Sequence, residues 1–219
     1  MSSTAAQQFD PIRTSPAPER LLAAAEAVLF RDGVQALAIR SIARESGLNS
    51  ALISYHFGGI GALLGRLVEI NVAALCDARA LRVAEAVTIR SKAERLEALV
   101  AAYLEPLWRT PAVWHPGPAR TVIRGLMPLL SPAARSPSVE RINRSVEESQ
   151  LPMLELLPHL SPDALQLRMQ LLAGAADELR LRAHGMGLFP LQGVGASGHD
   201  GPLRDELIAL ALAGLQAKP

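Results

Sequence analysis

Apolar residues recur every three or four positions through most of this 219-residue chain, and no segment alternates apolar with polar residues convincingly. The first spacing places apolar side chains on one face of an α-helix, whereas alternation is typical of a half-buried strand. Alanine and leucine dominate, while β-branched and aromatic residues are sparse, which favours helices by intrinsic propensity. Hydrophobic residues make up 49% of the chain, enough for a buried core. The sequence therefore predicts an all-α protein.

Glycine and proline divide this pattern into separate helices. Glycines end three short helices predicted early in the chain, which run from Pro18 to Gly33, from Ile39 to Ser46 and from Ser50 to about His56. A long apolar stripe then begins at Gly61 and continues past Leu81.

The rest of the chain is also predicted to be helical, with two loops. The expected helices cover about 92–108, 119–131, 138–157, 162–186 and 202–216. Loops are predicted at 110–118, which is rich in proline, and at 187–201, which is rich in glycine. Pro106, Pro128 and Pro152 lie inside predicted helices and are expected to kink or break them.

Composition excludes several classes of protein. Basic and acidic residues are nearly balanced, 22 against 21, so net charge does not indicate a partner. The single cysteine, Cys76, rules out an internal disulfide and a multi-cysteine metal site. The N-terminus lacks the apolar segment of a signal peptide, and no apolar run approaches the roughly 18 to 20 residues of a membrane span. We expect a cytoplasmic protein with no metal, cofactor or membrane partner.

Residues 39–57 have the layout of a helix-turn-helix, in which one short helix braces a second that enters the major groove of DNA. Ile42, Ala43 and Ile53 are expected to point inward, with Gly47 making the turn and Leu48 filling the core. This leaves the outer face of the second helix free for contact. Spacing alone also fits an ordinary helical hairpin.

A longer stretch carries a resemblance to a known family. Residues 19–64, ERLLAAAEAVLFRDGVQALAIRSIARESGLNSALISYHFGGIGALL, resemble the N-terminal domain of TetR/AcrR-family transcriptional regulators. The matching landmarks are LFRDGV, IRSIARESGLN and YHFG, and the last looks most like the branch that has N-Y-H-F-G there. The rest of the chain resembles the family in length and helical layout only.

The resemblance implies a set of DNA-binding residues and a domain layout. Positions that contact DNA in the family correspond here to Arg40, Ser50, Ala51, Leu52, Ser54, Tyr55 and His56. Phe57 corresponds to an aromatic of the core. The implied layout is a flexible arm (1–16), a three-helix DNA-binding domain (17–60) and a larger helical domain for ligand binding and dimerisation (61–219), joined through a long helix.

The sequence departs from the family pattern in three ways. Ala38 stands where a serine or threonine usually caps the helix, a loss of roughly 0.5 to 2 kcal/mol. Gly58-Gly59-Ile60-Gly61 replaces an opening that normally carries a capping serine and a phosphate-binding lysine, and Ser54 replaces the asparagine of the resembled branch. Residues 1–66 carry six arginines against five acidic residues, a weak electrostatic attraction for DNA.

The larger domain offers candidates for a dimer interface and a ligand pocket. The helix predicted from Pro162 is apolar on two faces, so one face is expected to meet a partner chain together with the last helix. The interface candidates are Leu167, Leu171, Gly174, Ala175, Leu207 and Leu210. The pocket candidates are Trp108, Trp114, His115, Arg124, Met127, Arg180 and His184, in a domain apolar enough to suggest a greasy pocket.

These observations lead to one main interpretation and an alternative. The first is a homodimeric, ligand-responsive regulator, a repressor released from a palindromic DNA operator by a small, largely apolar effector. The alternative is a helical protein that binds small molecules or proteins and has a weakened DNA-binding domain. No metalloprotease, nucleophile-elbow, phosphate-loop or dinucleotide motif is present, so we do not expect an enzyme.

Overall fold

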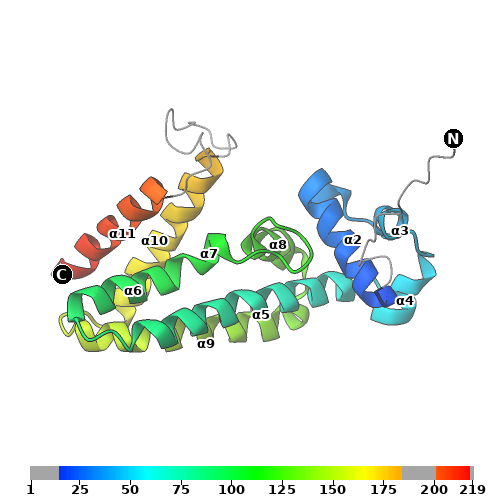
Figure 1. Ribbon diagram of the computed structural model, residues 1–219. Helices are drawn as coiled ribbons and strands as arrows, with labels where there is room; N and C mark the ends of the chain where they lie inside the picture. The colour runs from blue at the N-terminus through cyan, green and yellow to red at the C-terminus, as the bar shows by residue number, and fades with distance from the viewer. Residues whose placement is uncertain (1–14, 184–200, 218–219) are drawn as a thin grey trace, which may run out of the picture. The chain divides into compact units, whose positions relative to one another are not determined.

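The computed structural model describes residues 15–183 and 201–217. Within these ranges every regular element is helical, which confirms the predicted all-α class (Figure 1). The α-helices are α2 (Ala17–Asp32), α3 (Ile39–Ser46), α4 (Ala51–Phe57), α5 (Ile60–Ala86), α6 (Lys92–Leu104), α7 (Pro106–Arg109), α8 (Ala119–Leu126), α9 (Pro132–Leu156), α10 (Pro162–Ala183) and α11 (Gly201–Gln216). Two short 3₁₀ helices, η1 (Val34–Ala36) and η2 (Met127–Leu129), lie between them.

Contacts divide the chain into two compact units, and the first comprises residues 1–74 and 111–139. In this unit α2 packs against η1, α3 and α4. Leu21, Ala25 and Val28 form the buried stripe of α2, because their three- and four-residue spacing puts them on one face. Gly125 of α8 also lies against side chains at the end of α2 and in η1.

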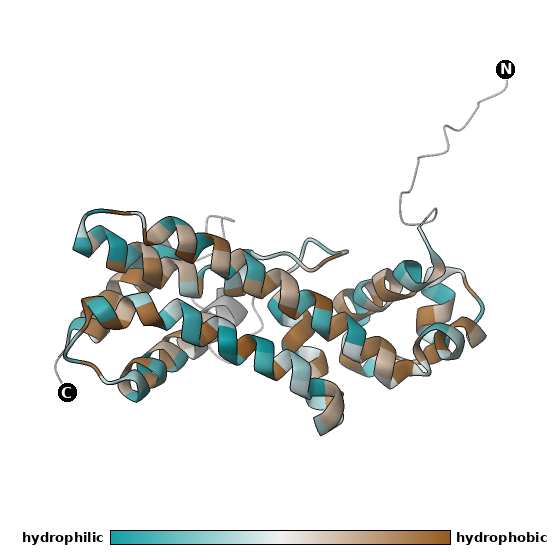
Figure 2. Cartoon of the chain, turned by 90° about the horizontal axis from the view of Figure 1, so that it is seen from below, coloured by the Kyte–Doolittle hydropathy of each residue, from teal (hydrophilic) through white to brown (hydrophobic). Residues whose placement is uncertain are grey.

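The second unit comprises residues 75–110 and 140–219. Its described part contains α6, α10 and α11, each of which contacts the other two. The later part of α5 lies beside α9, where Arg141 donates to Asp77 at 2.8 Å and Arg79 donates to Ser145 at 3.3 Å. Arg79 is 3% exposed and its guanidinium lies 4.7 Å from the ring centre of Tyr103. Apolar and polar residues follow one another in short blocks along the helices, the pattern of amphipathic segments with a buried face (Figure 2).

Proline has different effects at the three positions that the sequence singled out. Pro106 separates α6 from α7, and Pro128 lies in η2 just after α8 ends, as predicted. Pro152 does not break its helix, because α9 is assigned as one helix through this residue, and a kink there stays a prediction. Met153 and Leu157 beside it are buried at 0% and 2% exposure, and this packing outweighs the loss of one backbone hydrogen bond.

Candidate nucleic-acid interface

Two short helices in the first unit present an outward face. Ile42 and Ile53 are completely buried and Ala43 nearly so, which confirms their predicted inward orientation. A helix of seven residues such as α4 is too short to be stable alone, so the packing of Ile53 against the unit fixes it. The opposite face of α4 is thereby held toward solvent.

The turn between α3 and α4 is closed by backbone and side-chain hydrogen bonds. Gly47 adopts a left-handed conformation with φ of 66°, which a residue with a Cβ atom rarely takes. The Leu48 N–H donates to the Ala43 carbonyl at 3.2 Å, and the Ala51 N–H donates to Asn49 Oδ1 at 2.9 Å. Because Asn49 supplies this acceptor, Ser50 makes no capping bond and its hydroxyl is left at the surface.

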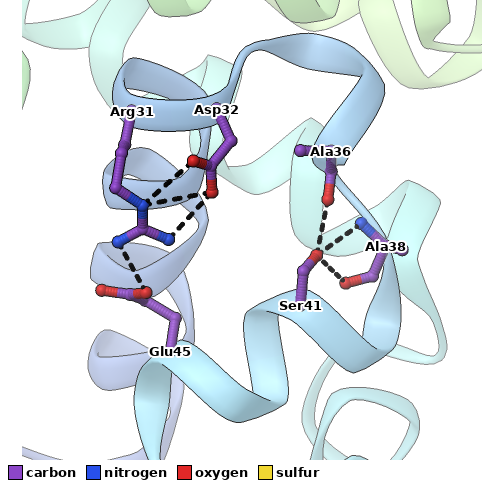
Figure 3. Close-up of polar contacts among 6 residues, drawn as sticks. All are labelled: Arg31, Asp32, Ala36, Ala38, Ser41 and Glu45. Carbon is purple, nitrogen blue, oxygen red and sulfur yellow. Dashed lines mark hydrogen bonds and ion pairs between the residues drawn. The ribbon is translucent and has the colours of Figure 1, made fainter.

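The start of α3 has half of a capping box. Ala38 has no side-chain acceptor for the first N–H groups of the helix, as the sequence indicates. Ser41, however, accepts a hydrogen bond from the Ala38 N–H at 3.0 Å and lies 2.6 Å from the Ala36 carbonyl (Figure 3). This reciprocal bond fixes the entry into α3 without the usual serine or threonine cap.

Arg31 joins the end of α2 to α3. Its guanidinium binds Asp32 at 2.9 Å and Glu45 of α3 at 2.8 Å (Figure 3). The hydrogen bonds raise the pKa of Arg31, and they lower the pKa of Asp32 below its usual value. Arg20 makes a second connection by donating to the Ser46 carbonyl at 2.8 Å. Two of the unit's arginines therefore hold its own helices together.

The predicted DNA-contact residues lie on the outward face. Tyr55 is 81% exposed, with its ring edge-on to the ring of His56 at a centroid distance of 4.9 Å. Leu52 is half-buried, as is Phe57, the predicted core aromatic. The remaining predicted residues are all exposed: Arg40, Ser50, Ala51, Ser54 and His56.

Few cations are available beside this face. Arg20 and Arg31 are engaged in contacts within the unit, and Arg66 is paired with Glu69 at 2.9 Å. The side chains of Arg40 and Arg44 of α3 are exposed and form no hydrogen bond with another described residue. Within the described part of this unit, these two guanidiniums are exposed near the predicted DNA-contact residues and are not used in an ion pair.

Comparison with known proteins identifies the N-terminal helices. Residues 21–67 match the model of the family described as bacterial regulatory proteins, tetR family. This segment is a TetR-family DNA-binding domain. It contains α3 and α4 with the exposed surface described above. No curated protein matches the sequence significantly.

Solved structures resemble the chain over nearly its whole length. A bacterial regulatory protein of the tetR family from Rhodococcus RHA1 is 17% identical, with a TM-score of 0.69 and coverage of 94% of this chain and 100% of that one. The TetR-family regulator PfmR from Thermus thermophilus is 16% identical, with a TM-score of 0.59 and coverage of 90% and 98%. A TetR-family member from Streptomyces coelicolor, SCO3833, is 20% identical, with a TM-score of 0.55 and coverage of 93% and 94%. At these identities the resemblance shows a shared fold.

The first unit also contains a buried polar contact that sequence reasoning missed. Glu26 of α2 is completely buried and accepts hydrogen bonds from Asn71 Nδ2 and from the Trp114 N–H, both at 2.8 Å. Burial raises the pKa of Glu26 above its usual value, although the bonds from Asn71 and from the Trp114 and Val113 backbone, and the nearby His115, act in the opposite direction. One carboxylate thus connects α2 with α5 and with the loop at 111–118.

A stacked pair of rings holds the same loop against α2. The His115 ring lies 3.9 Å from the Phe30 ring at an angle of 8°, and its Nδ1 accepts from the Gly117 N–H at 2.9 Å. A Cβ atom on Gly117 would overlap the Phe30 ring, so this close approach requires glycine. The loop at 111–118 is therefore held against α2 by two contacts, the Glu26 carboxyl with the Trp114 N–H and the Phe30 ring with the His115 ring.

The predicted pocket residues are distributed over both units. Trp114, His115, Arg124 and Met127 belong to the first, while Trp108 is half-buried in α7 of the second. The side chains of Arg180 and His184 lie outside the described residues. None of the other five predicted residues lines the groove between α5, α6 and α11 in the second unit. Their contact with a ligand stays a prediction.

The predicted interface residues of α10 and α11 are exposed, with one exception. Leu167, Leu171 and Leu210 are 58%, 66% and 62% exposed, and Gly174 and Ala175 are also exposed. Leu207 is only 4% exposed, so it lies in the core of its own unit. Helix α10 therefore carries apolar side chains on two faces, as expected. Leu165 and Met169 are completely buried, whereas Leu167 and Leu171 are exposed.

No single described helix is both long and apolar enough to cross a bilayer. Helices α4 and α5, bent by 59° relative to each other, meet the criterion of length and composition only when taken together.

Proposed function

We propose that the chain is a homodimeric, ligand-responsive transcription regulator that represses by binding a palindromic operator and is released by a small effector. DNA contact is assigned to residues 17–60, and ligand binding and dimerisation to residues 61–219. The observation that carries the proposal is the 81% exposure of Tyr55 on a helix whose opposite side chain, Ile53, is completely buried. An outward tyrosine on a rigidly packed recognition helix is suited to contact with a phosphate or a base edge.

Release by an effector follows from thermodynamic linkage. In a twofold dimer the two recognition helices would enter successive major grooves about 34 to 36 Å apart. An effector that binds better to a conformer with another spacing weakens DNA binding by no more than that preference. The apolar composition of the second domain supports a largely apolar effector.

Alanine substitutions at the recognition surface test the DNA-binding assignment. Tyr55→Ala and Arg40→Ala are each expected to weaken binding to a selected operator by about 1 to 3 kcal/mol. Both side chains are exposed, so the thermal unfolding of the protein should not change. Fluorescence polarisation with labelled duplex measures the affinity, and Arg144→Ala on the exposed surface of α9 is the matched control. Full affinity in both variants would refute the assigned recognition surface.

A charged side chain at the exposed face of α10 tests the dimer. Gly174→Glu is expected to convert a dimer into a monomer, because a carboxylate would be buried between two apolar surfaces. Nothing lies within 4 Å of a Cβ atom placed on Gly174, so the chain itself accepts the substitution. Light scattering gives the mass, and Gln166→Glu, at an exposed polar position of the same helix, should leave it unchanged. A dimeric Gly174→Glu variant would contradict the proposed interface.

The scarcity of available cations favours a second candidate, a ligand-binding protein whose DNA-binding domain has weakened. The engagement of Arg20, Arg31 and Arg66 in contacts within the unit supports it. The salt dependence of DNA binding separates the two candidates, because each phosphate contact releases counterions. A measurable slope supports the regulator, and the absence of both binding and slope supports the weakened domain.

A further inference from the structure

A groove of about 820 Å³ runs along the second unit, between the end of α5, the helix α6 and the first turn of α11. One wall is apolar and built from small residues, which include Ala98, Ala101 and Ala102 of α6 together with Ile89. The other end is polar and contains three arginines, Arg82, Arg109 and Arg204, around Glu105. The size is that of cavities that bind small organic ligands, about 300 to 1,000 Å³.

The polar end is organised by one buried carboxylate. Glu105 has a side chain that is only 3% exposed, and its Oε2 lies 2.7 Å from Arg82 Nη1. Its Oε1 accepts a short hydrogen bond from Arg204 Nε. A buried carboxylate has to be paired and hydrogen-bonded, and Arg82 with Arg204 supplies a donor to each of its oxygens.

The positive charge of Arg109 is not needed to pair the Glu105 carboxylate. Its Nη1 lies 3.8 Å from Glu105 Oε2, beyond hydrogen-bonding distance, and its side chain is 48% exposed. Arg82 uses a single N–H in its bond with Glu105, although a guanidinium has five. The two guanidiniums therefore have N–H groups available at the groove, beside a carboxylate that is already neutralised.

Acidic residues on the rim limit the positive charge to one end. Asp205 is 70% exposed and accepts from Arg204 Nη1 at 2.8 Å, so it reduces the attraction of that arginine for an anion. Glu85 also lines the groove and is exposed. Arg82 and Arg109 are consequently the pair that a negatively charged group would meet next to the apolar wall.

We propose that this groove binds a small amphipathic anion, with its carboxylate, phosphate or sulfonate group on Arg82 and Arg109 and its apolar body on the alanine-lined wall of α6. Such groups accept paired hydrogen bonds from a guanidinium, and the small side chains leave room for a flat or aliphatic body. As the effector class of the regulator this inference rests on the proposed function, whereas binding in the groove is measurable without it.

Two fluorescent probes that differ by one charged group test the site. Anilinonaphthalene sulfonate is an amphipathic anion, and phenylnaphthylamine has a similar aromatic body without the sulfonate. Arg109→Gln is expected to raise the Kd for the anionic probe roughly five- to tenfold, through loss of a charge-assisted contact, and to leave binding of the neutral probe unchanged. Arg109→Lys, which keeps the charge, should restore part of the affinity. Arg144→Gln, on the exposed surface of α9, is the matched control and should change neither.

Competition by phosphates tests the apolar wall separately. Octyl phosphate should displace the anionic probe at a concentration at least roughly tenfold below that of inorganic phosphate, because its chain buries apolar surface on the wall. Equal potency of the two phosphates would overturn the amphipathic part of the inference.

The remaining outcomes distinguish the groove from the regulator function. Equal probe affinity in the wild type and in Arg109→Gln, or no saturable binding of the anionic probe, would overturn the groove as a site. Operator binding measured on the same samples reports on the proposed function alone. Intact operator binding with unchanged probe affinity would therefore reject the site and retain the regulator, whereas the converse result would retain the site and reject the regulator. Arg109 is half exposed and has only a long ion pair, so its variants are expected to fold, and circular dichroism melts verify this.

Discussion

Replacing the buried carboxyl of Glu26 by an amide changes two opposing contributions to stability. In Glu26→Gln, the remaining oxygen can still accept from Asn71 Nδ2, which lies 2.8 Å away in the wild type. The new amide NH₂ would face the Trp114 N–H, now 2.8 Å from the second oxygen. A buried N–H without an acceptor costs about 1 to 3 kcal/mol. The variant is therefore expected to be less stable than the wild type.

The second contribution depends on pH, because only the wild type can ionise at this position. Burial raises the pKa of Glu26 above its ordinary value of 4.5, so the folded state holds the proton more tightly than the unfolded state. The wild type therefore loses stability as pH rises from 4.5 through the raised pKa, with a slope of at most about 1.4 kcal/mol per pH unit. The glutamine variant lacks this loss. Its deficit should be largest near pH 4.5 and become smaller as pH rises.

Urea denaturation at several pH values and one fixed protein concentration measures this difference. Stability curves that run parallel from the acidic to the neutral range would refute the buried, proton-binding role of Glu26. A deficit that grows with pH would do the same, because it would mean that the folded state favours the ionised form.

Two further substitutions test contacts of the DNA-binding unit. Gly117→Ala should lower the free energy of unfolding in urea by about 1 to 3 kcal/mol, because the new Cβ overlaps the Phe30 ring. Gly61→Ala, with open space around it, is the control. Equal stability of the two variants would contradict the close packing of the loop. Ser41→Ala should lower stability by roughly 0.5 to 2 kcal/mol by removing the acceptor of the Ala38 N–H, and an unchanged melting temperature would show that this bond does not fix the start of α3.

Local sequence signals were sufficient for the turn and the inward face of the two short helices. Gly47 and the spacing of Ile42 and Ile53 define both the turn and the inward face, because helix ends and helix faces depend on neighbours within a few residues. Asn49 was missed as the residue that caps the turn, although an asparagine two positions before a helix is a recognisable signal. The missing cap at Ala38 was predicted correctly, but the compensating bond from Ser41 was not.

Contacts between distant segments could not be predicted in the same way. Glu26 occupies the apolar face of its helix, four residues after Leu22 and three before Leu29, and this position indicates burial. Its acceptor role depends on Trp114, which lies 88 residues away, and no periodicity relates the two. Glu105 and Arg204 are 99 residues apart, so their pairing in the groove is equally absent from local patterns.

The Glu26 contact also sets an order for folding during synthesis. Helix α2 leaves the ribosome early, but its buried carboxylate has no backbone partner until residue 114 has been made, 88 residues later. At about 5 to 20 residues per second this interval lasts roughly 4 to 18 seconds. During that time water can occupy the place of the Trp114 N–H at the Glu26 carboxyl. The first unit is thus built from two segments of the chain, and the second of them is synthesised well after the first.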